Sequence, residues 1–134
     1  MALFDAMSIA GSGMLAHRKW LDAVSDNISN INTVSATNED AFQQRFVDVQ
    51  AVDYGSGDGG VRVAGVEFGS AEGRLVYEPD HPLADANGYV KYPDIDLGDQ
   101  MTELMIAQRG YQANVAVIER AKDAYTAALQ LGKG

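Results

Sequence analysis

The sequence predicts a mainly α-helical chain with a small β insert. Long N- and C-terminal helices are expected to pair as a coiled coil, on either side of a middle region that contains a β-hairpin. Apolar residues recur at helical and heptad spacing near both ends, whereas β-branched and aromatic residues gather in the middle around a glycine-rich turn. The predicted divisions are residues 1–33 (N-terminal helix), 34–92 (connector and small β region) and 93–134 (C-terminal helix), with the two helices forming one coiled-coil domain.

The C-terminal segment carries the clearest helical pattern. One apolar stripe recurs every three to four positions and consists of Leu97, Met101, Leu104, Tyr111, Val115, Ile118, Tyr125 and Leu129. Proline disfavours a helical conformation in the residue before it, so Tyr92 should be extended and Asp94 or Asp96 can cap the helix. At about 1.5 Å per residue this helix is roughly 50 Å long. It therefore needs a long partner.

The N-terminal segment supplies that partner. A helix is predicted from about Leu3 to Asn30, and two heptad rows run along it: Met7, Met14, Leu21 and Ile28 in one, and Leu3, Ala10, Val24 and Ile31 in the other. His17 stands where the second row would be apolar. Because no acidic residue or second histidine lies at helical spacing from it, we interpret His17 as a packing residue rather than a ligand or catalytic group. Two long seams indicate one coiled-coil unit.

A second row on the C-terminal helix is made of small residues, namely Ala107, Asn114, Ala121 and Ala128, with Gly110 nearby. This row faces either the chain's own N-terminal helix or helices of other subunits. Ordering about sixty helical residues costs on the order of 1–2 kcal/mol each, whereas one seam returns ~1.5–3 kcal/mol per buried large side chain. We therefore favour packing between subunits, with termini that fold on assembly. The predicted subunit-packing residues are Met7, Met14, Leu21, Ile28, Leu104, Tyr111, Val115, Ile118 and Tyr125.

The middle region is predicted to hold a hairpin. Residues 46–54 and 61–68 are rich in β-branched and aromatic residues and flank a turn from Gly55 to Gly60. A short third strand is expected at Leu75 to Tyr77, ended by Pro79. Residues 34–40 are polar, without periodicity, and are interpreted as a connector.

Composition and motifs disfavour most chemical functions. The net charge of −9 is the wrong sign for a nucleic-acid binder, and no apolar run approaches the ~20 residues of a membrane-spanning helix. The glycine-rich turn lacks the Gly-Lys-Ser/Thr ending of a phosphate loop, and the chain has no cysteine and no metal-ligand motif. We predict no enzyme activity, no catalytic residue, no cofactor, no metal site and no small-molecule substrate.

Several motifs resemble the bacterial flagellar rod and hook family. At the N-terminus they are SGMLA (residues 12–16), LD (21–22) and NISNINT (27–33). Toward the C-terminus they are LVY (75–77), LADA (83–86), NGYV (87–90), YP (92–93), Met101 and RGYQAN (109–114). The second set is similar to a proximal-rod member of that family. The motifs occur in the family's order and cover most of the chain apart from residues about 34–60.

The resemblance implies a non-enzymatic structural subunit of the proximal rod. Such subunits polymerise helically into the drive shaft that transmits torque across the periplasm. The implied partners are other rod subunits and the basal-body export-gate adaptor, in a homo- and hetero-oligomeric assembly. The implied route is the flagellar type III apparatus without a cleaved signal peptide, which fits an N-terminus that carries Asp5 and lacks a basic region. The alternatives are another rod or hook subunit, or a soluble coiled-coil adaptor.

Overall fold

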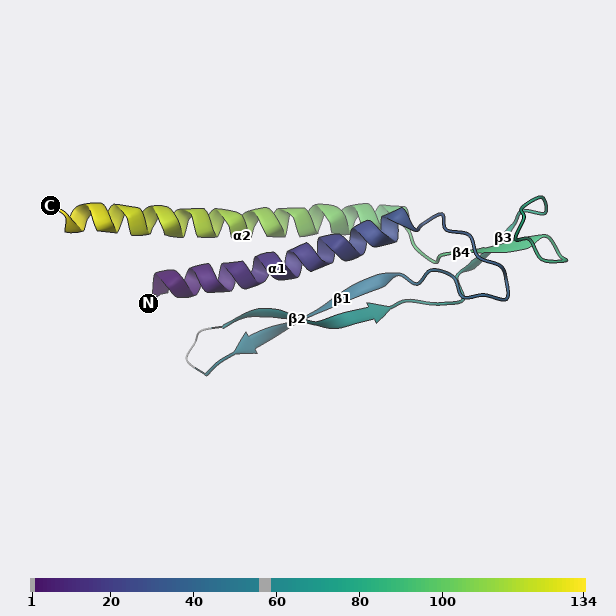
Figure 1. Ribbon diagram of the computed structural model, residues 1–134, viewed down its shortest axis with the longest axis horizontal. Coiled ribbons are helices and arrows are strands. Elements are labelled where there is room, and N and C mark those ends of the chain that lie inside the picture. Colours follow the sequence, from purple (N-terminus) through teal and green to yellow (C-terminus); the bar gives the residue numbers. More distant parts are fainter. Residues whose placement is uncertain (1, 56–58) are drawn as a thin grey trace. The chain divides into compact units, whose positions relative to one another are not determined.

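The structure is a computed structural model that describes residues 2–55 and 59–134. In chain order its elements are α1 (Ala2–Ser29), β1 (Arg45–Asp53), β2 (Gly59–Phe68), β3 (Arg74–Tyr77), β4 (Tyr89–Tyr92) and α2 (Leu97–Gly132) (Figure 1). The predicted fold class is confirmed: two long terminal helices with a small β insert between them. The middle of the predicted glycine-rich turn, at residues 56–58, lies outside the described residues.

Hydrogen bonds at the helix ends explain where α1 and α2 stop and start. The Asp96 carboxylate accepts a hydrogen bond from the Asp99 amide at 2.8 Å, so Asp96 is the N-cap that the sequence left open between two aspartates. At the other helix, the Asn30 side chain donates to the Asp26 carbonyl at 2.9 Å, just past the end of α1. The Asp96 side chain therefore satisfies an amide at the start of α2 that has no partner inside the helix, whereas the Asp26 carbonyl also accepts a hydrogen bond from the Asn30 amide at 3.1 Å.

The chain divides into two compact units, and both helices contribute to each. The first unit contains Met1–Leu21, Asp48–Gly65 and Met105–Gly134, and the second contains Asp22–Val47 and Val66–Leu104. We describe each unit by itself below.

The helices are neighbours in both units, and in the first unit they are antiparallel, because Phe4 lies against Tyr125, Gly13 against Asn114 and His17 against Gly110. In the first unit the Phe4 ring meets the Tyr125 ring edge-on, with 5.7 Å between centroids. In the second unit the Asn27 side chain donates a hydrogen bond to the Gln100 side chain at 2.9 Å. Within the first unit, the partners on α2 have lower residue numbers as those on α1 rise. The pairing of the two terminal helices predicted from their apolar rows is therefore confirmed.

The strands form two separate two-stranded sheets, β1 with β2 and β3 with β4. The short strand predicted at residues 75–77 is present as β3. Its partner is β4, with Arg74 opposite Tyr92 and Tyr77 opposite Tyr89 in antiparallel register. No strand was predicted at β4, which is four residues long and pairs with β3. Gly88, which precedes β4, takes a φ of 84°, a conformation that favours glycine.

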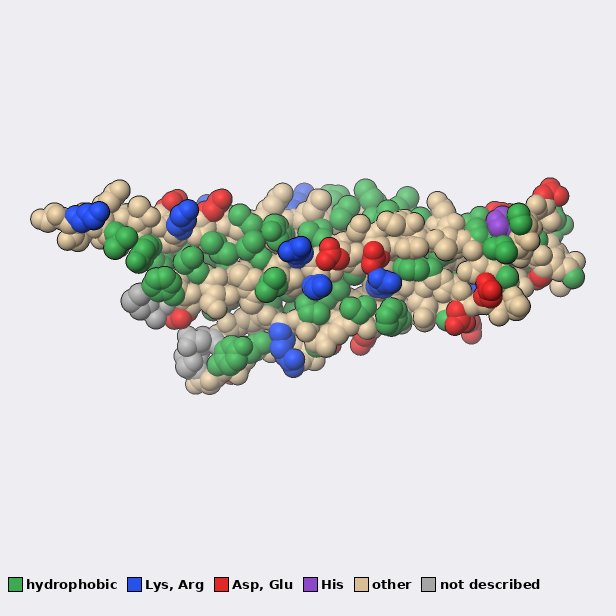
Figure 2. Space-filling model, in the orientation of Figure 1, with side chains coloured by type: hydrophobic (Ala, Val, Ile, Leu, Met, Phe, Trp, Pro, Cys, Tyr) green, Lys and Arg blue, Asp and Glu red, His purple; other side chains and the backbone are tan. Residues whose placement is uncertain are grey.

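Small residues dominate the core of this chain. The buried apolar residues are Ala10, Ala16, Ala23, Val24, Ala41, Val90, Ile95, Ala107 and Ala121. In contrast, twenty large hydrophobic residues among those described are exposed by 40% or more, and many apolar side chains are visible on the face in Figure 2. Contiguous exposed apolar surface usually marks a binding surface. The folded chain therefore leaves much of its large apolar side-chain surface uncovered.

Candidate assembly interface

Two glycines let the helices approach closely in the first unit. A methyl group added at Gly110 of α2 would overlap the His17 ring of α1. A methyl group added at Gly13 of α1 would lie 2.7 Å from the Asn114 side-chain oxygen of α2. Each helix therefore offers a glycine notch that receives a polar side chain of the other helix, because glycine has no Cβ to fill the space.

Each inserted side chain is also held by its own helix. His17 Nδ1 lies 2.7 Å from the Gly13 carbonyl oxygen, which can only accept, so Nδ1 carries the proton. Asn114 Nδ2 donates to the Gly110 carbonyl at 2.8 Å. The glycine of each notch thus anchors the side chain that fills the opposite notch. We call these four residues, Gly13, His17, Gly110 and Asn114, the glycine interlock.

The row of small residues on α2 faces α1 of the same chain. Ala107 and Ala121 are buried within the first unit, and Asn114 enters the Gly13 notch. For these three residues the structure agrees with the alternative in which the row lies inside the chain, and the predicted packing between subunits stays a prediction. Small side chains permit close contact between helix backbones, so the contact forms along the small row and the large side chains lie beside it. Ala128, near the end of α2, is exposed.

A serine joins α1 to the β1–β2 sheet in the first unit. Ser12 Oγ donates to the Ile9 carbonyl at 2.6 Å and accepts a hydrogen bond from the Val61 amide at 3.1 Å. Gly60 lies against the same hydroxyl, and a methyl group there would come within 2.7 Å of it. This role of Ser12 was not predicted from the sequence.

Buried amides join three elements in the second unit. Asn27, which is 0% exposed, donates to the Arg45 carbonyl of β1 at 3.0 Å and to Gln100 Oε1 of α2 at 2.9 Å. Its own oxygen accepts a hydrogen bond from the Arg45 amide at 2.8 Å. Gln100 is also 0% exposed, and its Nε2 has no hydrogen-bond partner among the described residues. We call Asn27, Arg45 and Gln100 the polar joint. Its one signal in the sequence is Asn27, the first residue of the NISNINT motif, and this role of Asn27 was not predicted.

The nine predicted subunit-packing residues flank the helix contact. Eight of them are half-buried, and Tyr125 is 42% exposed. Met14 of α1 and Tyr111 of α2 line one groove of about 220 Å³ in the first unit, together with Gly11, Leu15 and Arg18. The heptad spacing puts Met7, Met14 and Leu21 on one stripe of α1. Large side chains along this flank keep part of their apolar surface free, and their role in subunit packing stays a prediction.

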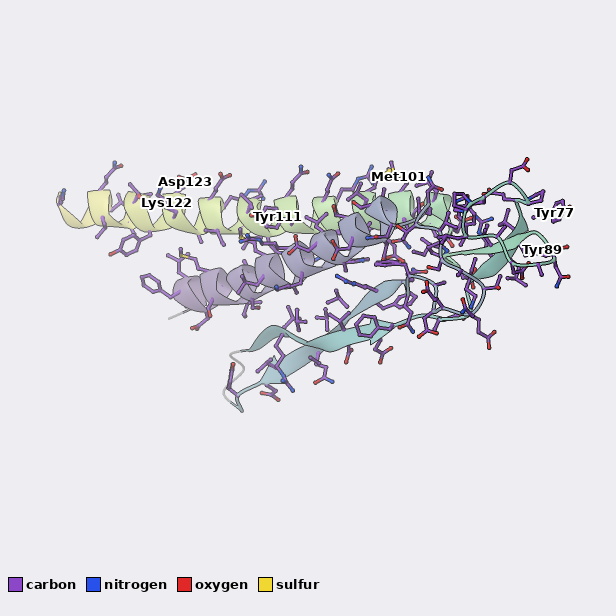
Figure 3. All side chains as sticks on the ribbon, turned by 45° about the vertical axis from the view of Figure 1, so that its right-hand side comes forward. Tyr77, Tyr89, Met101, Tyr111, Lys122 and Asp123 are labelled. Carbon is purple, nitrogen blue, oxygen red and sulfur yellow. The ribbon has the colours of Figure 1, made fainter. Side chains whose placement is uncertain are left out.

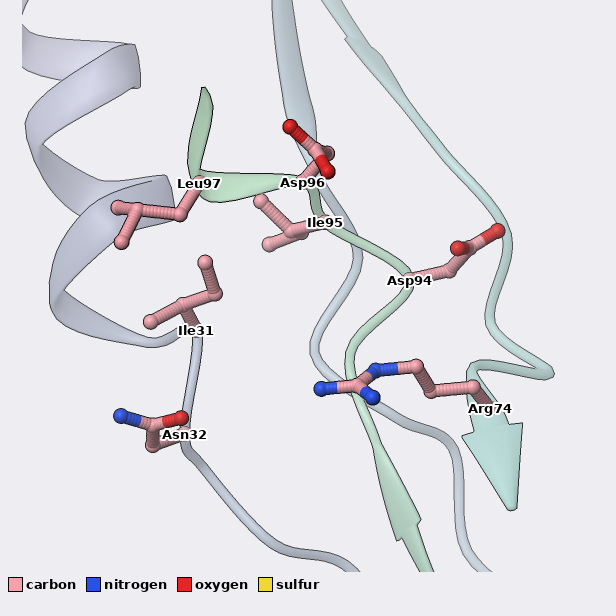
Figure 4. Close-up of a pocket in the computed structure, with 7 residues that line it drawn as sticks. All are labelled: Ile31, Asn32, Arg74, Asp94, Ile95, Asp96 and Leu97. Carbon is pink, nitrogen blue, oxygen red and sulfur yellow. The ribbon is translucent and has the colours of Figure 1, made fainter. Parts of the chain in front are cut away.

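The second unit contains a hollow of about 490 Å³ beside the start of α2 (Figure 4). Ile31, Ile95 and Leu97 form its apolar side, while Arg74 extends into it from the other side. The Arg74 guanidinium also lies 5.5 Å from the centre of the Tyr92 ring. Among residues 2–55 and 59–134, no group of three acidic or histidine side chains is placed to hold a metal ion. Within the same ranges, none of the helices has the length and apolar character needed to cross a membrane.

Two ionisable groups stabilise the β3–β4 region. The Asp85 carboxylate accepts hydrogen bonds from the Tyr89 amide (3.0 Å), the Asn87 amide (2.9 Å) and the Thr37 hydroxyl (3.1 Å). These bonds, the one from Tyr89 foremost, lower the pKa of Asp85 below its ordinary value. The Tyr92 hydroxyl donates to Glu78 at 2.9 Å, and this bond raises the pKa of Tyr92. Both contacts fix turns and strands, so we interpret their role as structural.

Comparison with protein families gives two matches that lie at opposite ends of the chain. Residues 7–37 match the family described as flagella basal body rod protein. Residues 86–131 match the family described as the C-terminal part of the flagellar basal body rod FlgEFG proteins. The matched segments contain most of α1 and α2, including the glycine interlock.

Comparison with curated proteins gives relatives along the whole chain. The flagellar basal-body rod protein FlgC of Salmonella typhimurium is 41% identical over 135 residues, which cover 99% of this chain and 100% of that protein. The FlgC of Borreliella burgdorferi is 31% identical over 153 residues, with all of both chains covered. The FlgC of Bacillus subtilis is 29% identical over 150 residues, covering 99% of this chain and 100% of the relative.

Proposed function

Because the chain belongs to the flagellar basal-body rod protein FlgC family, we propose that it is a subunit of the proximal rod that polymerises helically into the drive shaft. Its role is structural rather than catalytic, and its place is the flagellar basal body. The observation that carries this conclusion is the similarity to FlgC over 99% of the chain, with 41% identity to the Salmonella typhimurium protein.

The geometry of the chain is suited to such a role. The intramolecular helix contact uses small residues, so the large apolar side chains flanking it are only partly covered. A subunit of a helical assembly contacts neighbours through two different surfaces, because a heterologous contact that does not close joins one surface of each copy to the other surface of the next. Such a subunit therefore needs apolar surface on more than one side. Met14 and Tyr111, which share a groove, are the residues we expect a neighbouring helix to cover.

We extend the proposal to partners and to the route of export. Other rod subunits are the expected neighbours, and the basal-body export-gate adaptor is the expected contact at the base of the rod. The chain is expected to reach the periplasm through the flagellar type III apparatus without cleavage of a signal peptide. What supports this extension is family membership.

Charge placed on the apolar flank of α2 tests the proposal. Leu104→Asp and Ile118→Asp, made in a strain that lacks the native chain, should abolish rod incorporation and motility while the protein is still expressed. The reason is that a carboxylate buried between helices without a partner is strongly unfavourable. Incorporation is measured by immunoblotting purified basal bodies, and helix content of each purified variant by circular dichroism.

The matched control is Gln112→Asp, which places the same charge at an exposed position of the same helix. It should leave incorporation unchanged. Normal rods built from the Ile118→Asp chain would contradict the assignment of the flank as an assembly surface.

A further inference from the structure

Charge is distributed unequally between the two units. The second unit holds thirteen acidic and three basic residues, a formal net charge of −10. The first unit holds six acidic and seven basic residues, a formal net charge of +1. The acidity of the whole chain therefore belongs to one unit. On the face shown in Figure 2, several acidic side chains lie over the region that contains β3 and β4.

The three cations of the second unit are already engaged inside it. Arg45 forms an ion pair with Asp26, and the Arg74 guanidinium lies over the Tyr92 ring. Lys91 Nζ donates to the Glu39 carbonyl at 2.8 Å. Nine acidic residues of this unit are exposed, namely Asp22, Glu39, Asp40, Glu67, Glu72, Asp80, Asp94, Asp96 and Asp99. A partner of this unit would therefore gain from carrying positive charge.

The second unit also exposes an aromatic surface. The register of β3 and β4 places Leu75, Tyr77 and Tyr89 on one face of the sheet, while Val76 and Val90 point to the other. Leu75 and Tyr77 are 62% and 63% exposed, and the two tyrosine rings meet edge-on at 5.4 Å (Figure 3). We call Leu75, Tyr77 and Tyr89 the aromatic face. Clustered exposed tyrosines are typical of residues that dominate protein interfaces.

Acidic groups border the aromatic face directly. Leu75 and Tyr89 line a hollow of about 580 Å³ whose wall also includes Glu72 and Asp85. Asp85 is engaged by three hydrogen bonds, whereas Glu72 is exposed, with its carboxylate available to a partner. A complementary surface would combine apolar side chains with guanidinium groups, since arginine stacks on aromatic rings and binds carboxylates.

The first unit carries such a surface on α2. One exposed stripe at helical spacing consists of Ile106, Arg109, Ala113, Val117 and Arg120. Ile106 and Val117 are large apolar residues left exposed by the contact with α1. We call these five residues the arginine stripe. Its two guanidinium groups lie among apolar side chains. The arginine stripe therefore has the combination of apolar and guanidinium groups expected of a partner for the aromatic face.

We propose that the aromatic face of one copy of this chain binds the arginine stripe of a second copy. The contact is heterologous, because acidic unit against acidic unit would be repulsive whereas acidic unit against the arginine stripe is attractive. Each copy keeps its other surface free, so further copies can add, and the rotation between copies decides whether the assembly closes into a ring or continues as a helix. This inference rests on the proposed function and specifies which surfaces meet when copies stack.

The first test is self-association of the full-length chain, measured by sedimentation velocity at 50 and 500 mM NaCl. The wild-type chain should associate at low salt, and the association constant should fall at least tenfold at high salt, because exposed charges are screened. Tyr77→Ala with Tyr89→Ala should weaken association at least tenfold at low salt. The control is Tyr54→Ala, a tyrosine that is 76% exposed near the end of β1, and it should have no effect.

The decisive test is rescue between two variants. Arg109→Glu with Arg120→Glu should lose self-association, as should Glu72→Lys with Asp80→Lys. An equimolar mixture of the two variants should restore it, because each supplies the charge that the other now needs. Arg62→Glu, which reverses an exposed cation of β2 outside the stripe, is the matched control and should associate like the wild type.

Three results would overturn the contact: wild-type association that does not depend on salt, variants that associate normally, or a mixture that is not restored. All substituted residues are exposed, with Tyr89 at 40% the least exposed of the three tyrosines, and equal thermal midpoints would show that each variant folds. Because the chain has no cysteine, disulfide crosslinking of Asn87→Cys with Ala113→Cys gives a second measurement. Mixed dimers should exceed dimers of either variant alone.

The proposed function can survive failure of this contact. If the Arg109→Glu and Arg120→Glu chain enters rods in normal amount, the chain is still a rod subunit, and the contact between copies is wrong. If that chain and the Ile118→Asp chain both enter rods normally, the packing of α2 in the proposed function is wrong as well.

Discussion

The same two helices are held together differently in the two units. In the first unit α1 and α2 meet through the glycine interlock, where each side chain fills a notch in the other helix. In the second unit they meet through the polar joint, where buried amides hydrogen-bond across α1, β1 and α2. The first contact depends on shape and the second on hydrogen-bond direction.

The distance between the two helices and the choice of which residues face each other therefore depend on different contacts. Notches and small residues allow a short distance between helices, and they gain from dispersion and apolar burial. A buried amide pairs with partners at defined positions only, so it penalises any shifted arrangement in which its partners are lost. We expect the polar joint to set which residues face each other and the glycine interlock to set how closely they do so.

Breaking the polar joint should have the largest effect on stability. Asn27→Leu leaves the Arg45 amide, the Arg45 carbonyl and Gln100 without their buried partner. At about 1–3 kcal/mol for each unsatisfied group, partly relieved by relaxation, the loss should be roughly 3–5 kcal/mol. Urea unfolding followed by circular dichroism measures it. Asn38→Ala, at an exposed turn position, should change stability by less than about 0.5 kcal/mol.

Filling a notch should have the next largest effect. Gly110→Val forces a branched side chain into the space of the His17 ring, and overpacking of this kind costs about 1–3 kcal/mol. Gly11→Ala on α1 is the control, because a methyl group there meets nothing within 4 Å. That control should stabilise the chain by up to about 1 kcal/mol through helix propensity. If the two variants have equal stability, the notch does not constrain the helices.

The ordering of these two effects is itself informative. If Gly110→Val costs more than Asn27→Leu, shape rather than hydrogen bonding dominates the pairing of α1 with α2. The double variant Gly110→Val with His17→Ala refines the result, because removing the ring should recover part of the loss.

The smallest expected effect concerns pH and the second unit alone. The pKa of Asp85 is lowered in the folded chain, so its contribution to stability is present above the unfolded pKa, near 4, and is lost as the pH falls through the lower folded value. The wild-type thermal midpoint should therefore drop more steeply below pH 4 than that of Asp85→Asn. Parallel curves for the two chains would show that the carboxylate bonds to Tyr89 and Asn87 do not stabilise the fold.

The helices and their pairing were predicted from the sequence because apolar periodicity over many turns is a strong signal, whereas their orientation was not predicted. The residues that form the contact between α1 and α2 were predicted less well. Large residues such as Met14 and Tyr111 were expected along the seam, yet the closest contacts involve Gly13 and Gly110. Hydrophobic patterning gives glycine little weight, so a notch that depends on a missing side chain does not appear in it.

The polar joint was missed for a related reason. Asn27 lies near the end of α1, where asparagine is common as a turn former, and its partner Gln100 is 73 residues away along the chain. A hydrogen bond between distant segments leaves no periodic trace. The strand β4 was missed because its pairing with β3 depends on the turn that Asp85 and Gly88 form. These features follow from tertiary contacts and not from local pattern.

The unequal lengths of α1 and α2 have a consequence for how a neighbour is recruited. Phe4 meets Tyr125, and residues 126–134 are exposed although α2 continues to Gly132. Free helical segments shorter than about 12 residues are marginal in water because starting a helix is unfavourable, whereas adding residues to one already formed is not. These last two turns are continuous with a helix held by α1, so the unfavourable nucleation step has already taken place. An incoming neighbour therefore meets a segment that is already helical, and its contact need not supply the free energy of starting a helix.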